Sequence, residues 1–195
     1  MTGSFLREPP ASPDVQARYD QDLAGGGYVR NGSRLWAHQP QTLNRLSELM
    51  SQALEPSGLN LRQRGILAAA AAAALGDSYC SLAWGGKLAK ACDTAVAAGV
   101  LNGTDTGLTG QEKATAAWAR TVATDPNATT PADIQALRDT GLDDRQIFAI
   151  TAFIALRLAF ATINDSLSAQ PDTQLAQSLP QQVRQAVTYG QPVAS

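Results

Sequence analysis

The sequence predicts an all-α fold, and three observations support this prediction. No segment alternates apolar and polar residues as a half-buried β-strand does. An apolar run that is mostly alanine, from Ile66 to Leu75, has high helix propensity because alanine loses no side-chain entropy on folding. Helix-capping pairs then recur through the second half of the chain. With 195 residues, the chain is long enough to bury the core of one domain.

The N-terminal part carries weaker signals. We expect Met1–Pro13, which contains several prolines, to be loose and extended. A short helix from Asp14 to Leu23 should end at the following glycines, and Tyr28–His38 should be an irregular approach with a brief turn. For His38, the only histidine, we predict a structural hydrogen bond rather than catalysis, because it has no recognisable catalytic partner.

The central helices have clearer boundaries. Apolar residues recur at helical spacing from Gln39 to Leu54. The alanine-rich helix follows and should end at Gly76, and Asp77 is a favoured N-cap for the next helix. We expect that next helix to continue to the Asn102-Gly103 pair. The alanine-rich helix is apolar on every side, which predicts that it is buried.

In the second half, each predicted helix begins at a capping box, in which two side chains satisfy each other's backbone amides. The boxes are Thr109 with Glu112, Thr130 with Asp133, and Asp143 with Gln146. The third box should open the longest helix, which ends near Leu167. A further amphipathic helix is predicted from Leu179 to Tyr189.

Composition excludes several classes of function. Acidic and basic residues number 17 and 15, for a net charge of −2, and no basic run predicts nucleic-acid binding. The longest apolar run is shorter than the roughly 20 residues that span a bilayer, and the N-terminus does not resemble a signal peptide. The 2 cysteines do not form a disulfide scaffold. We therefore expect a cytoplasmic protein without a membrane segment, a cofactor or a metal.

The Asp77 helix carries the main candidate chemistry. Cys80 lies one turn into it, and Trp84 follows one turn later on the same face. The helix N-terminus favours a thiolate, whereas the neighbouring carboxylate of Asp77 raises a thiol pKa. Two interpretations of Cys80 stay open: a reactive thiol, or a small buried residue packed against Trp84. Asp77 likewise is either a helix cap, a general base, or both.

The apolar helix, the turn, and the pattern Tyr79-Cys80-x-x-x-x-Gly85 together resemble the carboxymuconolactone decarboxylase and alkylhydroperoxidase (AhpD-like) superfamily. The resemblance extends from about Tyr28 to about Pro171. It implies an AhpD-like helical bundle over residues 28–171, an N-terminal extension over 1–27 and a tail with a short helix over 172–195. It also implies a homo-oligomer, a trimer or hexamer with a dimer as the alternative.

The peroxidase branch of this superfamily has a glutamate on the first helix, then Cys-x-x-Cys, then a histidine one turn later. The second cysteine of that pattern falls on Cys80. The other positions are occupied by Gly65 in place of the glutamate, Asp77 in place of the first cysteine, and Trp84 in place of the histidine. The resemblance therefore predicts the fold but not the dithiol peroxidase reaction.

Three functional hypotheses follow. The first is a small-molecule acid–base enzyme or binding protein that uses Asp77, with Trp84, Tyr79 and Gln63 as ligand-binding candidates. The second is a one-cysteine thiol antioxidant acting through Cys80. The third is a non-catalytic oligomeric scaffold with a filled pocket.

Arg157 is the remaining ligand-binding candidate. It stands inside the apolar stretch Ile150–Phe160, where a buried guanidinium needs a partner from elsewhere. We predict that the partner is Asp77 or a ligand carboxylate, within ion-pair distance or across a shared cavity. The alternative is that Arg157 extends along the helix edge to the surface.

Overall fold

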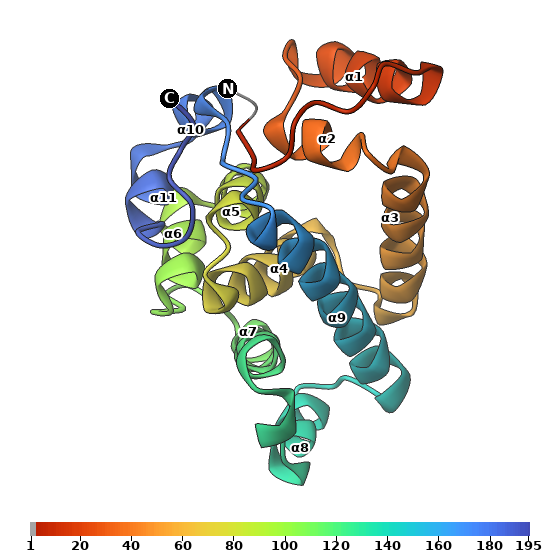
Figure 1. Cartoon of the computed structure of the whole chain (residues 1–195). Coiled ribbons are helices and arrows are strands. Elements are labelled where there is room, and N and C mark those ends of the chain that lie inside the picture. The colour runs from red at the N-terminus through yellow and green to blue at the C-terminus, as the bar shows by residue number, and fades with distance from the viewer. Residues whose placement is uncertain (1–2) are drawn as a thin grey trace.

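The computed structural model describes residues 3–195, which form helices joined by turns and contain no β-strand (Figure 1). The α-helices are α1 Pro13–Gly26, α2 Asn31–Trp36, α3 Pro40–Leu54, α4 Leu61–Leu75, α5 Ser78–Ala91, α6 Thr94–Asn102, α7 Gly110–Thr124, α8 Pro131–Asp139, α9 Asp144–Ser166, α10 Thr173–Ser178 and α11 Gln181–Ala186. Two short 3₁₀ helices, Glu55–Ser57 and Pro126–Ala128, follow α3 and α7. The predicted all-α class is confirmed.

The alanine-rich helix α4 is the centre of the fold. It packs against α5, α6, α7 and α9, and every residue from Gly65 to Ala72 is buried (Figure 1). Small side chains let the neighbouring helices approach closely: a Cβ at Gly65 would lie 3.2 Å from Leu88 Cδ1. A single chain therefore buries this helix, so its apolar surface does not itself require an oligomer.

The three predicted capping boxes are present at the starts of α7, α8 and α9, and Asn60 with Gln63 forms another at the start of α4. The two largest departures from the predicted boundaries lie in the first half of the chain. Residues 31–36 form helix α2 rather than an irregular approach. The helix after Asp77 breaks at Cys92, because the Asp93 side chain accepts the backbone N–H of Ala95 and caps a separate helix, α6.

The C-terminal segment is part of the core. Leu179 and Val183 are buried, and a Cβ on Gly86 would lie 2.3 Å from Leu179 Cδ2. At Gly85 a Cβ would lie 3.0 Å from Val183 Cγ1. The two glycines inside α5 thus allow the close approach that offsets their poor helix propensity. The tail also contains a helix that was not predicted, α10.

The N-terminal segment is also attached, rather than loose as expected. From Gly3 onward it lies against the loop after α9: the Phe5 amide donates to Leu167 O at 2.9 Å, and the Gln170 amide donates to Gly3 O at 2.8 Å. Met1 and Thr2 lie outside the described residues.

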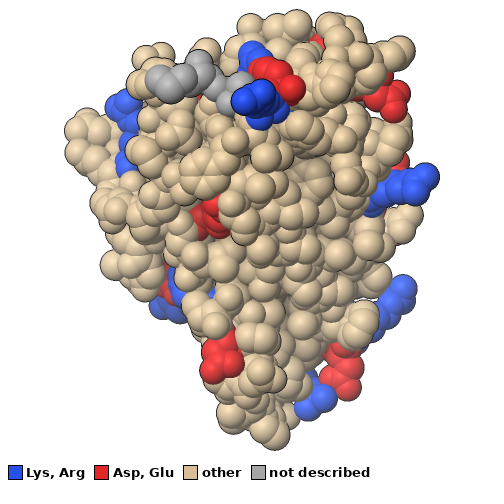
Figure 2. Space-filling view, viewed as in Figure 1, with Lys and Arg blue, Asp and Glu red and all other residues tan. Residues whose placement is uncertain are grey.

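The longest helix, α9, leaves one apolar side uncovered. Phe148 is 76% exposed, and Ala155, Ala159 and Ile163 are exposed along the same helix. Figure 2 shows the face over α9 as almost uncharged, with acidic and basic side chains mostly at its edges. By length and composition alone α9 could cross a membrane, since it has 23 residues and its most apolar stretch of 18 residues has a mean hydropathy of 1.9. Core helices of soluble proteins have the same length and hydropathy.

Candidate functional site

The turn between α4 and α5 places a carboxylate at the start of α5. Gly76 adopts a left-handed conformation, with φ of 81°, and ends α4. Asp77 follows as the N-cap, and its Oδ1 accepts the backbone N–H of Cys80 at 2.8 Å. Asp77 is fully buried, yet its Oδ2 atom has no hydrogen-bond partner within the described part of the chain. One oxygen therefore caps the helix and the other is left for a further interaction.

Cys80 lies beside this carboxylate and under the guanidinium of Arg157. Arg157 Nη2 donates to Cys80 Sγ at 3.0 Å. Burial raises the pKa of the Cys80 thiol, and Asp77 raises it further, whereas Arg157 acts in the opposite direction. The net shift is upward, so the site holds a neutral thiol at physiological pH.

Asp77, Cys80 and Arg157 line one small cavity between α4, α5 and α9. The remaining walls are Ala68, Ala71, Ala72, Leu75, Leu158 and Ala161. The cavity volume is about 10 Å³, which is room for about one water molecule. Arg157 and Asp77 thus share a cavity, but none of the ion pairs among residues 3–195 joins them.

A second carboxylate near this cavity was missed from the sequence. Asp165 lies two helical turns after Arg157, on the side of α9 that also carries Ala161. Burial and the charge of Asp77 raise the pKa of Asp165 from 3.8 to about 6. Burial also raises the pKa of Asp77, although the Cys80 contacts and Arg157 oppose the shift. The four-residue spacing of positions 157, 161 and 165 was the available signal.

Trp84 does not line this cavity. Its ring is surrounded by cations: Lys87 Nζ lies 4.3 Å from the ring centroid, and the guanidinium carbons of Arg157 and Arg64 lie at 5.4 Å and 5.5 Å. The indole is buried in the core. The structure therefore places Trp84 behind Arg157, as a support for positive charge rather than as a wall of the Asp77 cavity.

Tyr79 points toward the C-terminal segment. Its hydroxyl donates to Asp172 Oδ2 at 2.7 Å and accepts the backbone N–H of Gly32 at 3.3 Å. The Asp172 carboxylate also accepts the backbone N–H of Asn31 at 2.7 Å. Tyr79 thus joins α5 to α2 and the tail, and its ring faces a second pocket instead of the Asp77 cavity.

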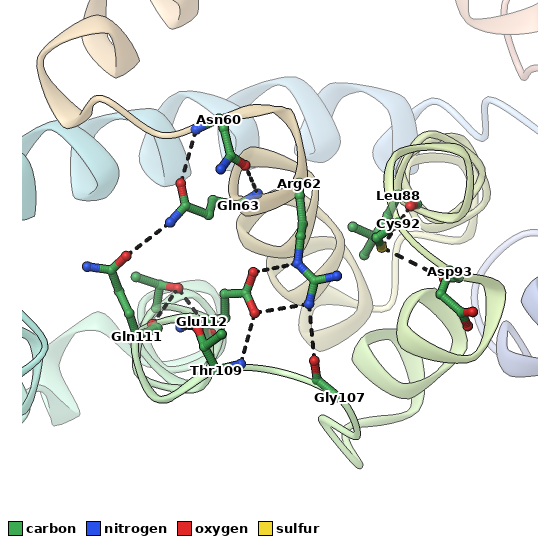
Figure 3. Close-up of polar contacts among 11 residues, drawn as sticks. Asn60, Arg62, Gln63, Leu88, Cys92, Asp93, Gly107, Thr109, Gln111 and Glu112 are labelled. Carbon is green, nitrogen blue, oxygen red and sulfur yellow. Dashed lines mark hydrogen bonds and ion pairs between the residues drawn. The ribbon is translucent and has the colours of Figure 1, made fainter.

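Gln63 belongs to a polar network at the start of α4 (Figure 3). Its Oε1 accepts the backbone N–H of Asn60 at 3.1 Å, and its Nε2 donates to Gln111 Oε1 at 3.0 Å. Beside it, Arg62 pairs with Glu112, with 2.6 Å between Nε and Oε1. These contacts join α4 to α7, so the geometry gives Gln63 a structural position away from the other candidates.

The two cysteines occupy different environments. Cys92, half-buried at the end of α5, donates from Sγ to Leu88 O at 3.0 Å (Figure 3). Both cysteines are free thiols.

His38 lies apart from both cysteines. Its Nε2 bonds to Arg7 O at 3.0 Å, as expected for a structural histidine. Among residues 3–195, no three His, Cys, Asp or Glu side chains converge as metal ligands.

The second pocket is larger and lies on the other side of Arg157. Its volume is about 280 Å³, and its walls include Arg30, Lys87, Arg157, Trp36, Tyr79 and Phe160. Trp36 and Phe160 stack with ring centroids 5.2 Å apart. Arg157 is a wall of both pockets, so it separates the small carboxylate cavity from the larger cationic one.

The chain matches no model of a known protein family, and no curated protein matches it. Solved structures do match. One is the alkylhydroperoxidase AhpD core of an uncharacterized peroxidase-related protein from Ralstonia eutropha JMP134, at 22% identity and a TM-score of 0.77, covering 88% of this chain and 94% of that one. An uncharacterized peroxidase-related protein from Silicibacter sp. TM1040 has 18% identity and a TM-score of 0.78, covering 89% and 94% of the two chains.

The debrominase Bmp8 is similar at 14% identity and a TM-score of 0.71, covering 94% of this chain and 96% of that one. A cysteine-to-alanine variant of Bmp8, in complex with 2,3,4-tribromopyrrole, matches with a TM-score of 0.70. This chain therefore has the AhpD-like fold, as predicted from the sequence.

Proposed function

We propose that this protein uses its AhpD-like fold for small-molecule acid–base chemistry, or for binding that depends on the same carboxylate, and not for dithiol peroxidase chemistry. The observation that supports this most directly is the Oδ2 atom of Asp77. It is buried, has no hydrogen-bond partner in the described chain, and belongs to a carboxylate that lines a cavity with Arg157. Buried polar atoms without partners are rare, and a catalytic role is one of the reasons for which a fold retains them.

Asp77 is the proton-transfer group in this proposal. A carboxylic acid with a raised pKa accepts or donates a proton more readily near neutral pH than an exposed one does. Asp165, with a pKa raised to about 6, is electrostatically coupled to Asp77, so the protonation of one carboxyl affects that of the other. Arg157 would stabilise the anionic form of Asp77 or of a reacting oxygen.

The one-cysteine alternative has one contact in its favour, the donation from Arg157 to Cys80 Sγ. A thiolate at that position would be stabilised by the guanidinium. However, Cys80 is 3% exposed and its pKa is raised, so a peroxide would meet a buried neutral thiol. The thiolate is the reactive form, and this arrangement disfavours it.

The small volume of the Asp77 cavity is the observation that favours the scaffold alternative. About 10 Å³ admits no organic ligand. In our proposal the ligand body instead occupies the neighbouring pocket of about 280 Å³, and movement of Arg157 opens the way to Asp77.

The acid–base proposal predicts proton exchange that depends on Asp77. Small lactones and β-keto acids would be incubated with the protein in D₂O, and deuterium incorporation next to the carbonyl would be followed by NMR. We expect Asp77→Asn to abolish the exchange and Cys80→Ser to retain it. Exchange faster than in buffer alone that persists in Asp77→Asn, or no acceleration over buffer with any compound, would contradict the acid–base proposal.

We also propose that the protein is a soluble, cytoplasmic homo-oligomer in which a second copy covers the exposed side of α9. A two-fold interface brings the same patch together from both chains, and an uncharged apolar patch is complementary to itself. Light scattering should give a mass above the 20.4 kDa of one chain.

A pair of variants tests whether the exposed side of α9 forms the interface between copies. Ala155→Glu should dissociate the assembly, whereas Gln135→Glu on the exposed side of α8 should not. A single-chain mass for the unmodified protein, or partition into lipid vesicles in place of self-association, would refute this assignment.

A further inference from the structure

Three cations gather around Trp84 without a carboxylate partner. Lys87 and Arg157 lie over the indole ring, as does Arg64, which also lies 5.6 Å from the Phe153 ring centroid. None of the three makes an ion pair with an acidic side chain among residues 3–195. The Nε atom of Arg64 is buried and has no hydrogen-bond partner there. Unpaired cations this close together repel one another, and an anion would relieve the repulsion.

The pKa directions agree with this crowding. Lys87 is exposed, but partial desolvation of its ammonium group against Trp84 lowers its pKa, and the positive charges of Arg157, Arg64 and Arg30 lower it further. Burial and Arg157 also lower the pKa of Arg64.

The acidic residues near the second pocket are already engaged. Asp22 pairs with both Arg18 and Arg30, so this carboxylate is not available to Lys87 or Arg157. The Asp172 carboxylate accepts hydrogen bonds from Tyr79 and the Asn31 amide. On the other side of Arg157, Asp77 is close enough to feel its charge but makes no ion pair with it. Lys87 and Arg157 therefore bring uncompensated positive charge to the pocket.

The pocket's aromatic walls have also used their polar groups. The Trp36 indole N–H donates to Asn164 Oδ1 at 2.8 Å, and the Tyr79 hydroxyl is bonded to Asp172. What these rings offer a ligand is apolar contact, chiefly from the half-buried Phe160, because Trp36 and Tyr79 are only 5% and 8% exposed. The free donors are those of Lys87, which is exposed, and of Arg157. The volume of about 280 Å³ is close to the lower limit of roughly 300 Å³ for small-molecule pockets.

We propose that this pocket binds a small organic anion whose carboxylate or phosphate group pairs with Lys87 and Arg157 and whose planar apolar part lies against Trp36, Tyr79 and Phe160. The inference rests on the proposed small-molecule function for its biological use. Binding itself needs no proton transfer by Asp77, so the two proposals can fail separately.

The test uses isothermal titration calorimetry at low ionic strength with benzoate and phenyl phosphate as anionic probes. Benzamide, which is uncharged and similar in shape to benzoate, is the neutral control. We expect at least one anion to bind at least about tenfold more tightly than benzamide. The stronger of the two anions would distinguish a carboxylate ligand from a phosphate ligand.

Variants then locate the site. Lys87→Gln should weaken anion binding about tenfold, whereas Lys90→Gln, an exposed lysine on the same helix, should leave it unchanged. The unmodified protein separates the two proposals, because anion binding without any proton exchange would refute only the acid–base proposal. Anions that bind no better than benzamide, or equal losses in Lys87→Gln and Lys90→Gln, would overturn this inference. Binding of an acidic peptide, without binding of either small anion, would also overturn this inference.

Discussion

The two pockets that meet at Arg157 differ in charge and size. On one side, Asp77 lines a cavity of about 10 Å³ and Asp165 lies near it, and burial raises the pKa values of both carboxyl groups. On the other side, Lys87 is an amine whose pKa is lowered, in a pocket of about 280 Å³. The fold does not fully neutralise the charge in either pocket. The two charges have opposite signs, and the guanidinium of Arg157 lies between the pockets.

This difference indicates a division of roles. A small cavity with an unpartnered carboxylate oxygen suits proton transfer but cannot hold a substrate. A larger pocket with aromatic walls and cationic donors suits binding, and no carboxylate among residues 3–195 lines it. We infer that Arg157 connects the two, and the predictions below separate them.

The largest expected effect concerns thiol reactivity, which depends on the burial of Cys80. A disulfide reagent at pH 8 should modify Cys92 at least about 100-fold faster than Cys80, because the Cys80 thiol must first become exposed and then ionise. Measurements on Cys92→Ser and Cys80→Ser assign the two rates. Rapid modification in Cys92→Ser would support the one-cysteine antioxidant instead.

The residues that replace the peroxidase pattern around Cys80 predict the outcome with alkyl hydroperoxides. With Gly65, Asp77 and Trp84 in place of the glutamate, first cysteine and histidine, we expect no turnover of alkyl hydroperoxides with a dithiol donor. A coupled assay measures this, with Cys80→Ser as the comparison. Turnover that Cys80→Ser abolishes would show that the chain retains a peroxidase site.

Arg157→Leu should be the most damaging of the charge changes, because it alters both pockets. It leaves Asp77 and Cys80 without their cationic neighbour, and we expect a loss of about 2 kcal/mol in the free energy of unfolding. Chemical denaturation measures this loss, with the exposed Arg145→Leu on the same helix as the control. An unchanged melting temperature in Arg157→Leu would mean that Arg157 interacts mainly with solvent.

How far the sequence predicts this molecule depends on the range of the interactions. Capping boxes such as Thr109 with Glu112 are local, and they located helix starts correctly. The break at Cys92 was also locally encoded, by Asp93 followed by Thr94, but the alanine-rich composition around it favoured one continuous helix. Residue spacing alone did not indicate that Tyr79 bonds with Asp172, because only the folded chain brings those segments together.

The candidate site shows the same limit. Asp77 as a cap could be predicted, since Gly-Asp at a helix junction is a local signal. The relation of Arg157 to Cys80, and of Trp84 to its surrounding cations, depends on how α9 crosses α4 and α5. Asp165 was missed because one aspartate near a helix end is ordinarily a solvated residue.

Asp165→Asn should change the pH dependence of stability. The pKa of Asp165 is raised from 3.8 to about 6 in the folded protein, so the folded state holds this proton more tightly than the unfolded state. Its stabilising contribution is complete below about pH 4 and is lost as the pH rises through about 6. Because the side chain is only half-buried, solvent screening limits the contribution to about 1 kcal/mol.

Urea denaturation between pH 4 and 8 measures this slope. Asp165→Asn should flatten it, and Asp139→Asn on the exposed side of α8 should not. A slope that is the same in Asp165→Asn would place the titration elsewhere.

The smallest effect is expected at Lys87, and it has the opposite sign from that of Arg157→Leu. Lys87→Gln removes a charge from among other cations, so the free energy of unfolding should rise by a few tenths of a kcal/mol. Lys90→Gln should leave stability unchanged. A loss of stability in Lys87→Gln would show that a partner neutralises this ammonium group.

The central claim is that Asp77 is a buried acid–base group and not only a helix cap, and ¹³C NMR titration of its carboxyl carbon tests this most directly. The assignment comes from comparison with Asp77→Asn. We predict that Asp77 titrates above its ordinary value of 3.8, and that Arg157→Gln raises this pKa further, because a stabilising cation is lost. Titration at or below 3.8, unaffected by Arg157→Gln, would mean that the carboxylate is fully satisfied as a cap, and it would contradict the proposed function.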